Sequence, residues 1–150
     1  MKKRTGPVNK IVMLCLLQLG MGMLWGQQPL LFKHLTVESG LSTNSTLSIA
    51  QDSSGYLWVG TMDGLNRYDG SRISIYHTFL QNFWQGAKRK ITCLLVDPKD
   101  RLWIGTNDGL FIYNKETDSF QAFFSNKGIP NSLSHNSINE LYLDRAGSVW

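Results

Sequence analysis

The apolar positions of this chain fall in short runs of four to six residues, separated by turns that contain Asp and Gly. Runs of this length between such turns are typical of β-strands. In a first set we expect strands at residues 46–51, 56–61, 65–68 and 73–77. In a second set we expect them at residues 91–96, 101–106, 110–113 and 119–124. The pattern therefore predicts an all-β chain in which a group of four strands occurs twice.

A sequence repeat underlies the two sets of strands. The stretch 52–68 returns as 97–113, and a third copy, with a first strand expected at 138–143, runs to the last residue. One Trp at the same place in each copy gives spacings of 45 and then 47 residues (Trp58, Trp103 and Trp150). A period of about 40–50 residues suits a four-stranded propeller blade. We therefore predict a β-propeller fragment of four-stranded antiparallel blades, with about two and a half repeats and an incomplete ring.

The repeat also sets the boundaries of the predicted segments. The first repeat is expected at residues 46–90, the second at 91–137 and the truncated third at 138–150, with further repeats to follow. Residues 30–36 are expected to form a strand that is out of phase with these repeats, because Phe32 aligns with Phe124 near the end of a blade. Such a strand can complete the last blade of a ring and remove its open edge.

Several residue types recur because the repeat needs them for its structure. An Asp that opens the first turn can accept hydrogen bonds from backbone N–H groups, and a Gly that closes it supplies a positive φ, for which Asp100 substitutes in the second copy. Asp-Gly pairs indicate two-residue hairpins, and the Gly after each Trp strand leaves room for a neighbouring blade. The structural residues are Asp52, Gly55, Trp58, Gly60, Asp63, Gly64, Asp97, Trp103, Gly105, Asp108, Gly109, Asp144, Gly147 and Trp150.

Residues 1–26 have the pattern of an export signal. A basic start precedes an apolar run that Gln18 interrupts, and Gly26 is a small residue suited to a cleavage site. The run is shorter than the roughly 20 apolar residues of a membrane-spanning helix, so a cleaved signal peptide is favoured and a signal anchor is the alternative. With Cys15 in this signal, Cys93 is the only thiol of the mature segment, and we expect it to be inert.

Composition and motifs exclude several classes of site. The net charge of +4 comes largely from the signal, so no surface for nucleic acid is expected. No catalytic motif is present, and the three His residues lack a metal-ligand spacing. The turn Asp residues do not follow the EF-hand pattern, and turn formation already explains them. We therefore expect no catalytic residue, no metal and no cofactor in this segment.

Two long connections, at residues 78–90 and 125–137, are the natural place for recognition. Both are expected to open on one face of the ring, together with the loop at 40–45. They contain an aromatic platform and hydrogen-bonding groups that suit a polar, ring-shaped ligand such as a sugar: Trp84, Arg89 and His135. The alternative is that these residues only cover the ring and that later blades bind the ligand.

The pattern Asp-x-x-Gly-x-Leu-Trp-Val/Ile-Gly-Thr-x-x-Gly-Leu, preceded by Gly-Leu-Ser-x-Asn, resembles the two-component regulator propeller repeat. The resemblance implies the sensor region of a hybrid two-component histidine kinase on the periplasmic side of the inner membrane. It implies two seven-bladed propellers, an immunoglobulin-like domain, a membrane helix and an ATP-dependent kinase after this segment. It also implies an oligosaccharide ligand, a homodimer formed through the full-length receptor, and a phosphorelay that controls transcription.

Two other functions remain open at this point. The first is a secreted propeller enzyme, a lyase or a glycosidase, whose catalytic groups lie in later blades, because propellers host both binding and catalysis. The second keeps the sensor but couples it to a cyclase or a DNA-binding output. A second apolar run of about 20 residues followed by a kinase core would distinguish the sensor kinase from the enzyme.

Overall fold

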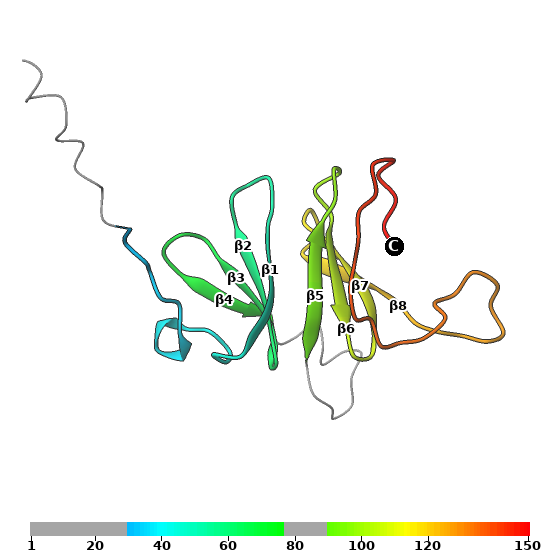
Figure 1. Cartoon of the computed structure of the whole chain (residues 1–150), viewed down its shortest axis with the longest axis horizontal. Helices are drawn as coiled ribbons and strands as arrows, with labels where there is room; N and C mark the ends of the chain where they lie inside the picture. The colour runs from blue at the N-terminus through cyan, green and yellow to red at the C-terminus, as the bar shows by residue number, and fades with distance from the viewer. Residues whose placement is uncertain (1–29, 77–89) are drawn as a thin grey trace, which may run out of the picture. The chain divides into compact units, whose positions relative to one another are not determined.

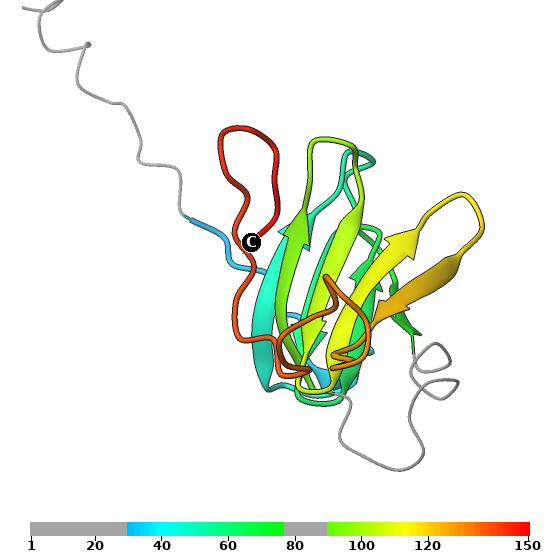
Figure 2. The same cartoon turned by 90° about the vertical axis from the view of Figure 1, so that its right-hand side faces the viewer.

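The computed structural model describes residues 30–76 and 90–150, and almost all of these belong to one compact unit, His34–Trp150. The unit contains two four-stranded antiparallel sheets, each with its strands in sequence order (Figures 1 and 2). The first sheet, blade 1, consists of β1 (Thr46–Gln51), β2 (Leu57–Thr61), β3 (Gly64–Tyr68) and β4 (Ile73–Tyr76). The second sheet, blade 2, consists of β5 (Ile91–Val96), β6 (Leu102–Thr106), β7 (Gly109–Asn114) and β8 (Ser119–Phe123). The predicted all-β fold is confirmed.

Helical structure is limited to one 3-10 turn among the described residues, η2 (Val37–Ser39). None of the helical structure in the described ranges is long and apolar enough to cross a membrane. The predicted signal, residues 1–26, lies outside the described residues and stays a prediction.

The tight turns inside each blade differ by one position from the expected Asp-Gly hairpins. Thr61 pairs with Gly64, so Met62 and Asp63 form the turn and the glycine starts β3 with a positive φ of 115°. The Thr61 hydroxyl closes this turn, because it accepts the N–H of Asp63 at 3.1 Å and donates to the carbonyl of Gly64 at 2.9 Å. Thr106 makes the same two bonds in blade 2.

Two predicted strands are absent. Residues 138–143 form no strand: they make an isolated bridge between Leu143 and Val149, two backbone hydrogen bonds between Tyr142 and Trp150, and one from Ile138 N–H to the carbonyl of Thr106. In blade 1 the first strand pairs with residues from Leu57 to Thr61, whereas the third copy offers only Val149 and Trp150 at the matching positions, too few for a strand ladder of that length. Residues 30–36 also form no strand, and Leu30, Leu31 and Phe32 are exposed. A strand needs a partner strand, and the closing of the ring by this segment stays a prediction.

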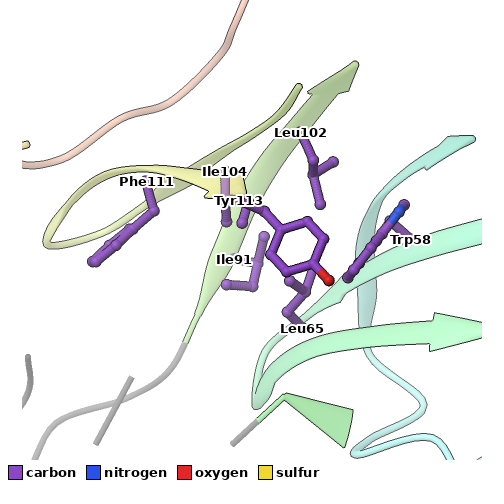
Figure 3. Close-up of a cluster of buried hydrophobic side chains, with 7 residues drawn as sticks. All are labelled: Trp58, Leu65, Ile91, Leu102, Ile104, Phe111 and Tyr113. Atoms are coloured by element: carbon purple, nitrogen blue, oxygen red, sulfur yellow. The ribbon is translucent and has the colours of Figure 1, made fainter. Parts of the chain in front are cut away.

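The hydrophobic core lies between the two blades (Figure 3). Trp58 and Leu65 of blade 1 face a larger group from blade 2 that consists of Ile91, Leu102, Ile104, Phe111 and Tyr113. The ring centroid of Tyr113 is 5.0 Å from that of Trp58, and Tyr76 lies 5.3 Å from Trp58 on the blade 1 side. Aromatic side chains bury about 150–250 Å² each, so this contact dominates the packing of one blade on the next.

Two glycines let the first residues of the next copy come close to the Trp strand. A Cβ at Gly60 would lie 2.6 Å from Cγ2 of Ile91, and a Cβ at Gly105 would lie 2.8 Å from Cγ2 of Ile138 and 2.4 Å from Sγ of Cys93. These separations are shorter than van der Waals contact, so neither position has room for a side chain. The glycines therefore allow the close approach between copies that the sequence predicts.

Candidate functional site

The loops and turns of the blades gather at two opposite edges (Figures 1 and 2). The connection edge contains the β2–β3 and β6–β7 turns together with residues 40–45 and 125–137. Backbone hydrogen bonds join these parts, from Met62 N–H to the carbonyl of Ser45 at 3.0 Å and from Gly109 N–H to the carbonyl of Asn136 at 2.7 Å. The turn edge contains the three turns that open with Asp and the β3–β4 and β7–β8 turns.

The connection edge is where the sequence places the ligand site, and the described residues contain one of the three proposed ligand-binding side chains. Trp84 and Arg89 lie outside the described residues. His135 is exposed, and its Nδ1 accepts the N–H of Ser137 at 3.0 Å, so its ring is oriented by the adjacent backbone. The described structure therefore brings His135 to the expected edge but does not test its pairing with the other two.

Asn136, which the sequence analysis did not single out, organises this connection. Its Oδ1 accepts the N–H of Ser125 at 2.6 Å and its Nδ2 lies 3.4 Å from Oδ1 of Asp108. Within the loop, the Ser132 hydroxyl accepts the N–H of Asn126 and donates to the carbonyl of the same residue. The connection is thus a hydrogen-bonded loop with its ends held together, which is the kind of preformed support that recognition requires.

An apolar hollow of about 380 Å³ lies beside this connection, lined by Trp103, Leu110, Phe123, Phe124, Ile129 and Leu133 among others. The hollow has the volume of a ligand pocket, but the repeat gives it another explanation. Trp103, Leu110 and Phe123 correspond to Trp58, Leu65 and Tyr76, the surface of blade 1 that Tyr113 of the next blade covers. We therefore interpret the hollow as a packing surface for a following blade.

The loop at 40–45 is held by a buried polar group in blade 1. Asn66 is fully buried, and its Oδ1 accepts the N–H of Ser42 at 3.0 Å while its Nδ2 donates to the Ser42 hydroxyl at 3.0 Å. The same Nδ2 lies 3.2 Å from the carbonyl of Val59. Because buried amides are costly unless they are hydrogen-bonded, this set of bonds fixes the loop on blade 1. Phe111 takes the corresponding place in blade 2, so the repeat gave no signal for it.

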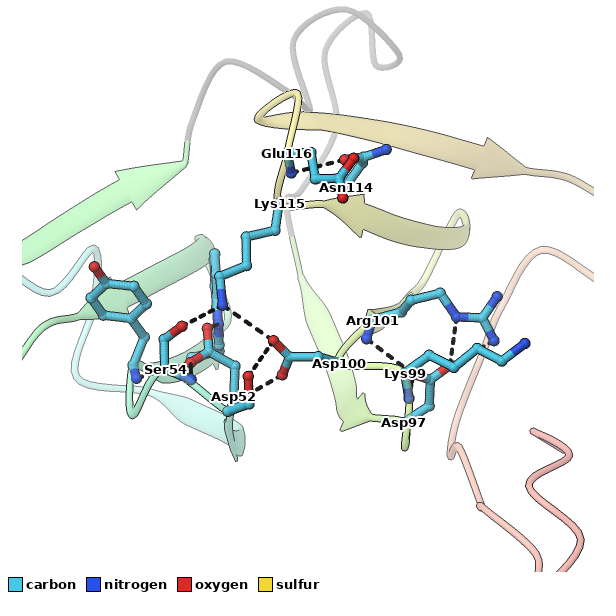
Figure 4. A network of polar contacts seen from close by, with 12 residues as sticks. Asp52, Ser54, Asp97, Lys99, Asp100, Arg101, Asn114, Lys115 and Glu116 are labelled. Atoms are coloured by element: carbon cyan, nitrogen blue, oxygen red, sulfur yellow. Dashed lines mark hydrogen bonds and ion pairs between the residues drawn. The ribbon is translucent and has the colours of Figure 1, made fainter.

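At the turn edge, the Asp that opens each first turn bonds the indole N–H of the repeated Trp (Figure 4 shows two of these turns). The donor–acceptor distances are 3.0 Å for Trp58 to Asp52, 2.9 Å for Trp103 to Asp97 and 2.8 Å for Trp150 to Asp144. The other carboxylate oxygen accepts two turn N–H groups in every copy. The constant spacing of six residues between Asp and Trp was the available signal, and the sequence analysis explained only the turn bonds.

Hydrogen bonds also determine the ionisation of these carboxyl groups. Burial by itself would raise the pKa of Asp97, but bonds from Trp103 and Arg101 outweigh it and the pKa lies below the ordinary value. The bond from Trp150 lowers the pKa of Asp144. Backbone N–H groups of Arg72 and Ser71 lower the pKa of the exposed Asp69 to about 2. Each group is therefore a carboxylate at neutral pH and accepts rather than donates.

Asp97→Asn is expected to destabilise the propeller by about 1–2 kcal/mol at pH 7, because the buried carboxylate accepts charge-assisted bonds from Trp103 and Arg101. A group whose pKa is lowered by folding contributes stability above its unfolded pKa of about 4 and loses it as pH falls through the folded value. The variant should therefore differ from the wild type at pH 7, and the difference should shrink as the pH falls through the lowered pKa of Asp97. Denaturant unfolding of the protein at several pH values measures this.

The control is Asp63→Asn, at a turn position whose backbone N–H, rather than its carboxylate, makes the bond that closes the turn. It should change the free energy of unfolding by less than about 0.5 kcal/mol at every pH. A pH-independent loss in Asp97→Asn would contradict the assignment of its effect to the ionised carboxylate.

The described residues offer little for metal or covalent chemistry. No three His, Cys, Asp or Glu side chains in the described ranges are grouped so that they could hold a metal ion. Cys93 is a free, half-buried thiol, and burial raises its pKa, which lowers the fraction of the nucleophilic thiolate. Asp52, Asp97 and Asp144 each accept hydrogen bonds from backbone N–H groups of their own turns.

Comparisons with known proteins find similarity to one family of repeats and to proteins of two-component systems. The family described as "Two component regulator propeller" matches residues 40–63 and 86–108. Among curated proteins, "Histidine kinase P4" from Formosa agariphila is 53% identical over 45 residues, which are 30% of this chain and 3% of that protein. The extracellular domain of a putative hybrid two-component system from B. thetaiotaomicron matches with a TM-score of 0.72 and 34% identity. That match covers 81% of this chain and 17% of the other, so the chain spans a small part of both relatives.

Proposed function

Because residues 40–63 and 86–108 match the two-component regulator propeller family, we propose that the chain is the N-terminal part of an exported ligand-sensing propeller in a membrane-bound hybrid histidine kinase. The observation that carries this proposal is the similarity of its two blades, over 81% of the chain, to the extracellular domain of a putative hybrid two-component system. The partial match to a histidine kinase supports the same class. The proposal includes membrane anchoring through a downstream helix, a periplasmic location for this segment and a homodimeric receptor.

We propose that the ligand is an oligosaccharide released from a polysaccharide and that it binds at the connection edge. Sugar sites combine an aromatic surface with hydrogen-bonding groups, and Trp84, Arg89 and His135 supply both in the two long connections. The loop that carries His135 is held by hydrogen bonds, so its backbone can support a bound ligand in a fixed position. Binding would be passed to an ATP-dependent kinase and a phosphorelay with a transcriptional output.

The proposal is tested with the full-length protein in membrane vesicles, by measuring phosphorylation from labelled ATP with and without oligosaccharide mixtures from defined polysaccharides. We expect at least one mixture to change the phosphorylation level. Trp84→Ala and His135→Ala should abolish or weaken that response while membrane insertion stays unchanged. The control is His34→Ala, which changes an exposed histidine outside both connections.

Other outcomes separate the alternatives. Cleavage of a polysaccharide by the purified protein, without any kinase activity, would support the secreted lyase or glycosidase instead. A ligand response that persists in Trp84→Ala, with normal affinity by calorimetry, would move the site to later blades while leaving the sensor function in place. A response read out as cyclic nucleotide or as DNA binding would replace the kinase output.

A further inference from the structure

Asp100 occupies a turn position where the other two copies have glycine. The corresponding Gly55 and Gly147 have φ values of 84° and 83°, and Asp100 adopts the same left-handed region with φ 59°. A residue with a Cβ pays a steric cost there, although Asp and Asn pay less than most. Strain of this kind that persists in a folded protein points to a compensating role for the side chain.

The Asp100 carboxylate reaches from blade 2 to the first turn of blade 1 (Figure 4). Its Oδ1 accepts the N–H of Ser53 at 2.7 Å, and its Oδ2 accepts the hydroxyl of the same serine at 2.6 Å. Lys115 completes the contact, with Nζ 3.2 Å from Oδ2 of Asp100 and a hydrogen bond to the hydroxyl of Ser54. These bonds lower the pKa of Asp100, led by the bond from the Ser53 side chain.

Two short bonds to an ionised carboxylate distinguish this contact from an ordinary surface ion pair. Exposed Lys–carboxylate pairs contribute little, so the Lys115 contact alone would not matter. Hydrogen bonds that involve a charged acceptor are roughly twice as strong as neutral ones, and a serine that donates both its N–H and its hydroxyl fixes the geometry. The contact therefore holds the two turns in one relative position.

We infer that Asp100 and Ser53 form an interblade latch that pins the turn edges of blades 1 and 2 together, and that the following junction lacks it. The reason lies in the equivalent residues. Pro98 stands where blade 1 has Ser53 and has no N–H to donate, and Gly147 stands where blade 2 has Asp100 and has no carboxylate. The repeat thus encodes one latched junction followed by one unlatched junction. This inference does not depend on which ligand the propeller binds.

The repeat also supplies variants that break the latch while keeping the turns intact. Asp100→Gly introduces the residue of the first and third copies and removes the steric cost of the positive φ. Ser53→Pro installs the residue of the second copy and removes the N–H donor. Taken locally, both changes favour the folded turn, because a compatible Pro or a relieved φ stabilises a protein. If the latch exists, each change must instead destabilise the turn of the other blade, which loses its hydrogen-bond partner.

Hydrogen exchange of the full-length protein, followed by mass spectrometry of peptides, measures each partner turn. Asp100→Gly should speed exchange about tenfold in the blade 1 peptide that contains residues 52–58. The lost charge-assisted hydrogen bonds correspond to about that factor in the equilibrium for local opening of the turn. Ser53→Pro should do the same in the blade 2 peptide that contains residues 97–103. The matched control is Asn131→Gly, which relieves a positive φ of 63° in the exposed connection. It should leave both peptides unchanged.

Faster exchange in the partner turn for both variants, with no change for the control, supports the latch. Unchanged or slower exchange in the partner turn for either variant overturns it, because Asp100 would then be only a tolerated turn residue. Ser53→Pro keeps the strained Asp100, so an effect of that variant cannot arise from the glycine substitution.

Discussion

Trp58→Ala is expected to destabilise the propeller by about 3–5 kcal/mol, the range for removal of a fully buried large aromatic side chain. Trp58 is 1% exposed and lies at the centre of the junction between the blades. The substitution removes its ring contacts with Tyr76 and Tyr113 and leaves Oδ2 of Asp52, in a buried carboxylate, without the indole donor. The cavity and the lost hydrogen bond both lower the free energy of unfolding.

Denaturant unfolding of the protein measures this loss. Two other variants separate the loss of the indole donor from the loss of the ring and provide a control. Trp58→Phe keeps an aromatic ring but lacks the indole N–H, so it should cost less than Trp58→Ala and should still leave Asp52 short of one donor. Val37→Ala changes an exposed apolar side chain, 47% accessible, away from the apolar hollow and should stay within about 0.5 kcal/mol of the wild type. A Trp58→Ala variant as stable as Val37→Ala would refute the assignment of the core to this junction.

The sequence could predict the blades because the repeat shows each requirement more than once. The first strands of both blades have the expected bounds, and the other strands differ by one or two residues. The same comparison predicts where glycine is needed, at Gly60 and Gly105, since a small residue at one place in each copy indicates close approach. The repeat also contained a signal for the partner of the second oxygen of each turn Asp, the constant spacing of six residues to the Trp, and the sequence analysis did not use it.

Features that differ between copies were not predictable in the same way. Asn66 and Asp100 stand where other copies have Phe111 and glycine, and only the structure shows that the first fixes a loop and the second crosses to another blade. Strands at 30–36 and 138–143 depend on partner strands, so a local pattern could not decide whether they form. The candidate ligand site has the same limitation, since Trp84, Arg89 and His135 lie in connections whose sequences do not repeat.

Gly60→Ala is expected to destabilise the propeller by about 2–3 kcal/mol, in the upper part of the range for overpacking a core. The new Cβ would lie 2.6 Å from Cγ2 and 3.0 Å from Cβ of Ile91, and Ile91 is fully buried. A β-branched side chain held on all sides cannot rotate away, so the strands β2 and β5 must separate. Alanine otherwise suits a strand better than glycine, which makes a loss of stability specific to the contact.

The same denaturant measurement, with a double-mutant cycle, identifies Ile91 as the obstacle. Ile91→Ala deletes the Cγ2 atom, so the double variant should lose about 1 kcal/mol less than the sum of the two single variants. Gly128→Ala is the matched control, because its Cβ would meet only Oδ1 of Asn126, at 3.4 Å, in an exposed loop. It should be within about 0.5 kcal/mol of the wild type. Strict additivity of Gly60→Ala and Ile91→Ala would mean that the two residues do not meet in solution, and that the close approach between copies is not what requires glycine at this position.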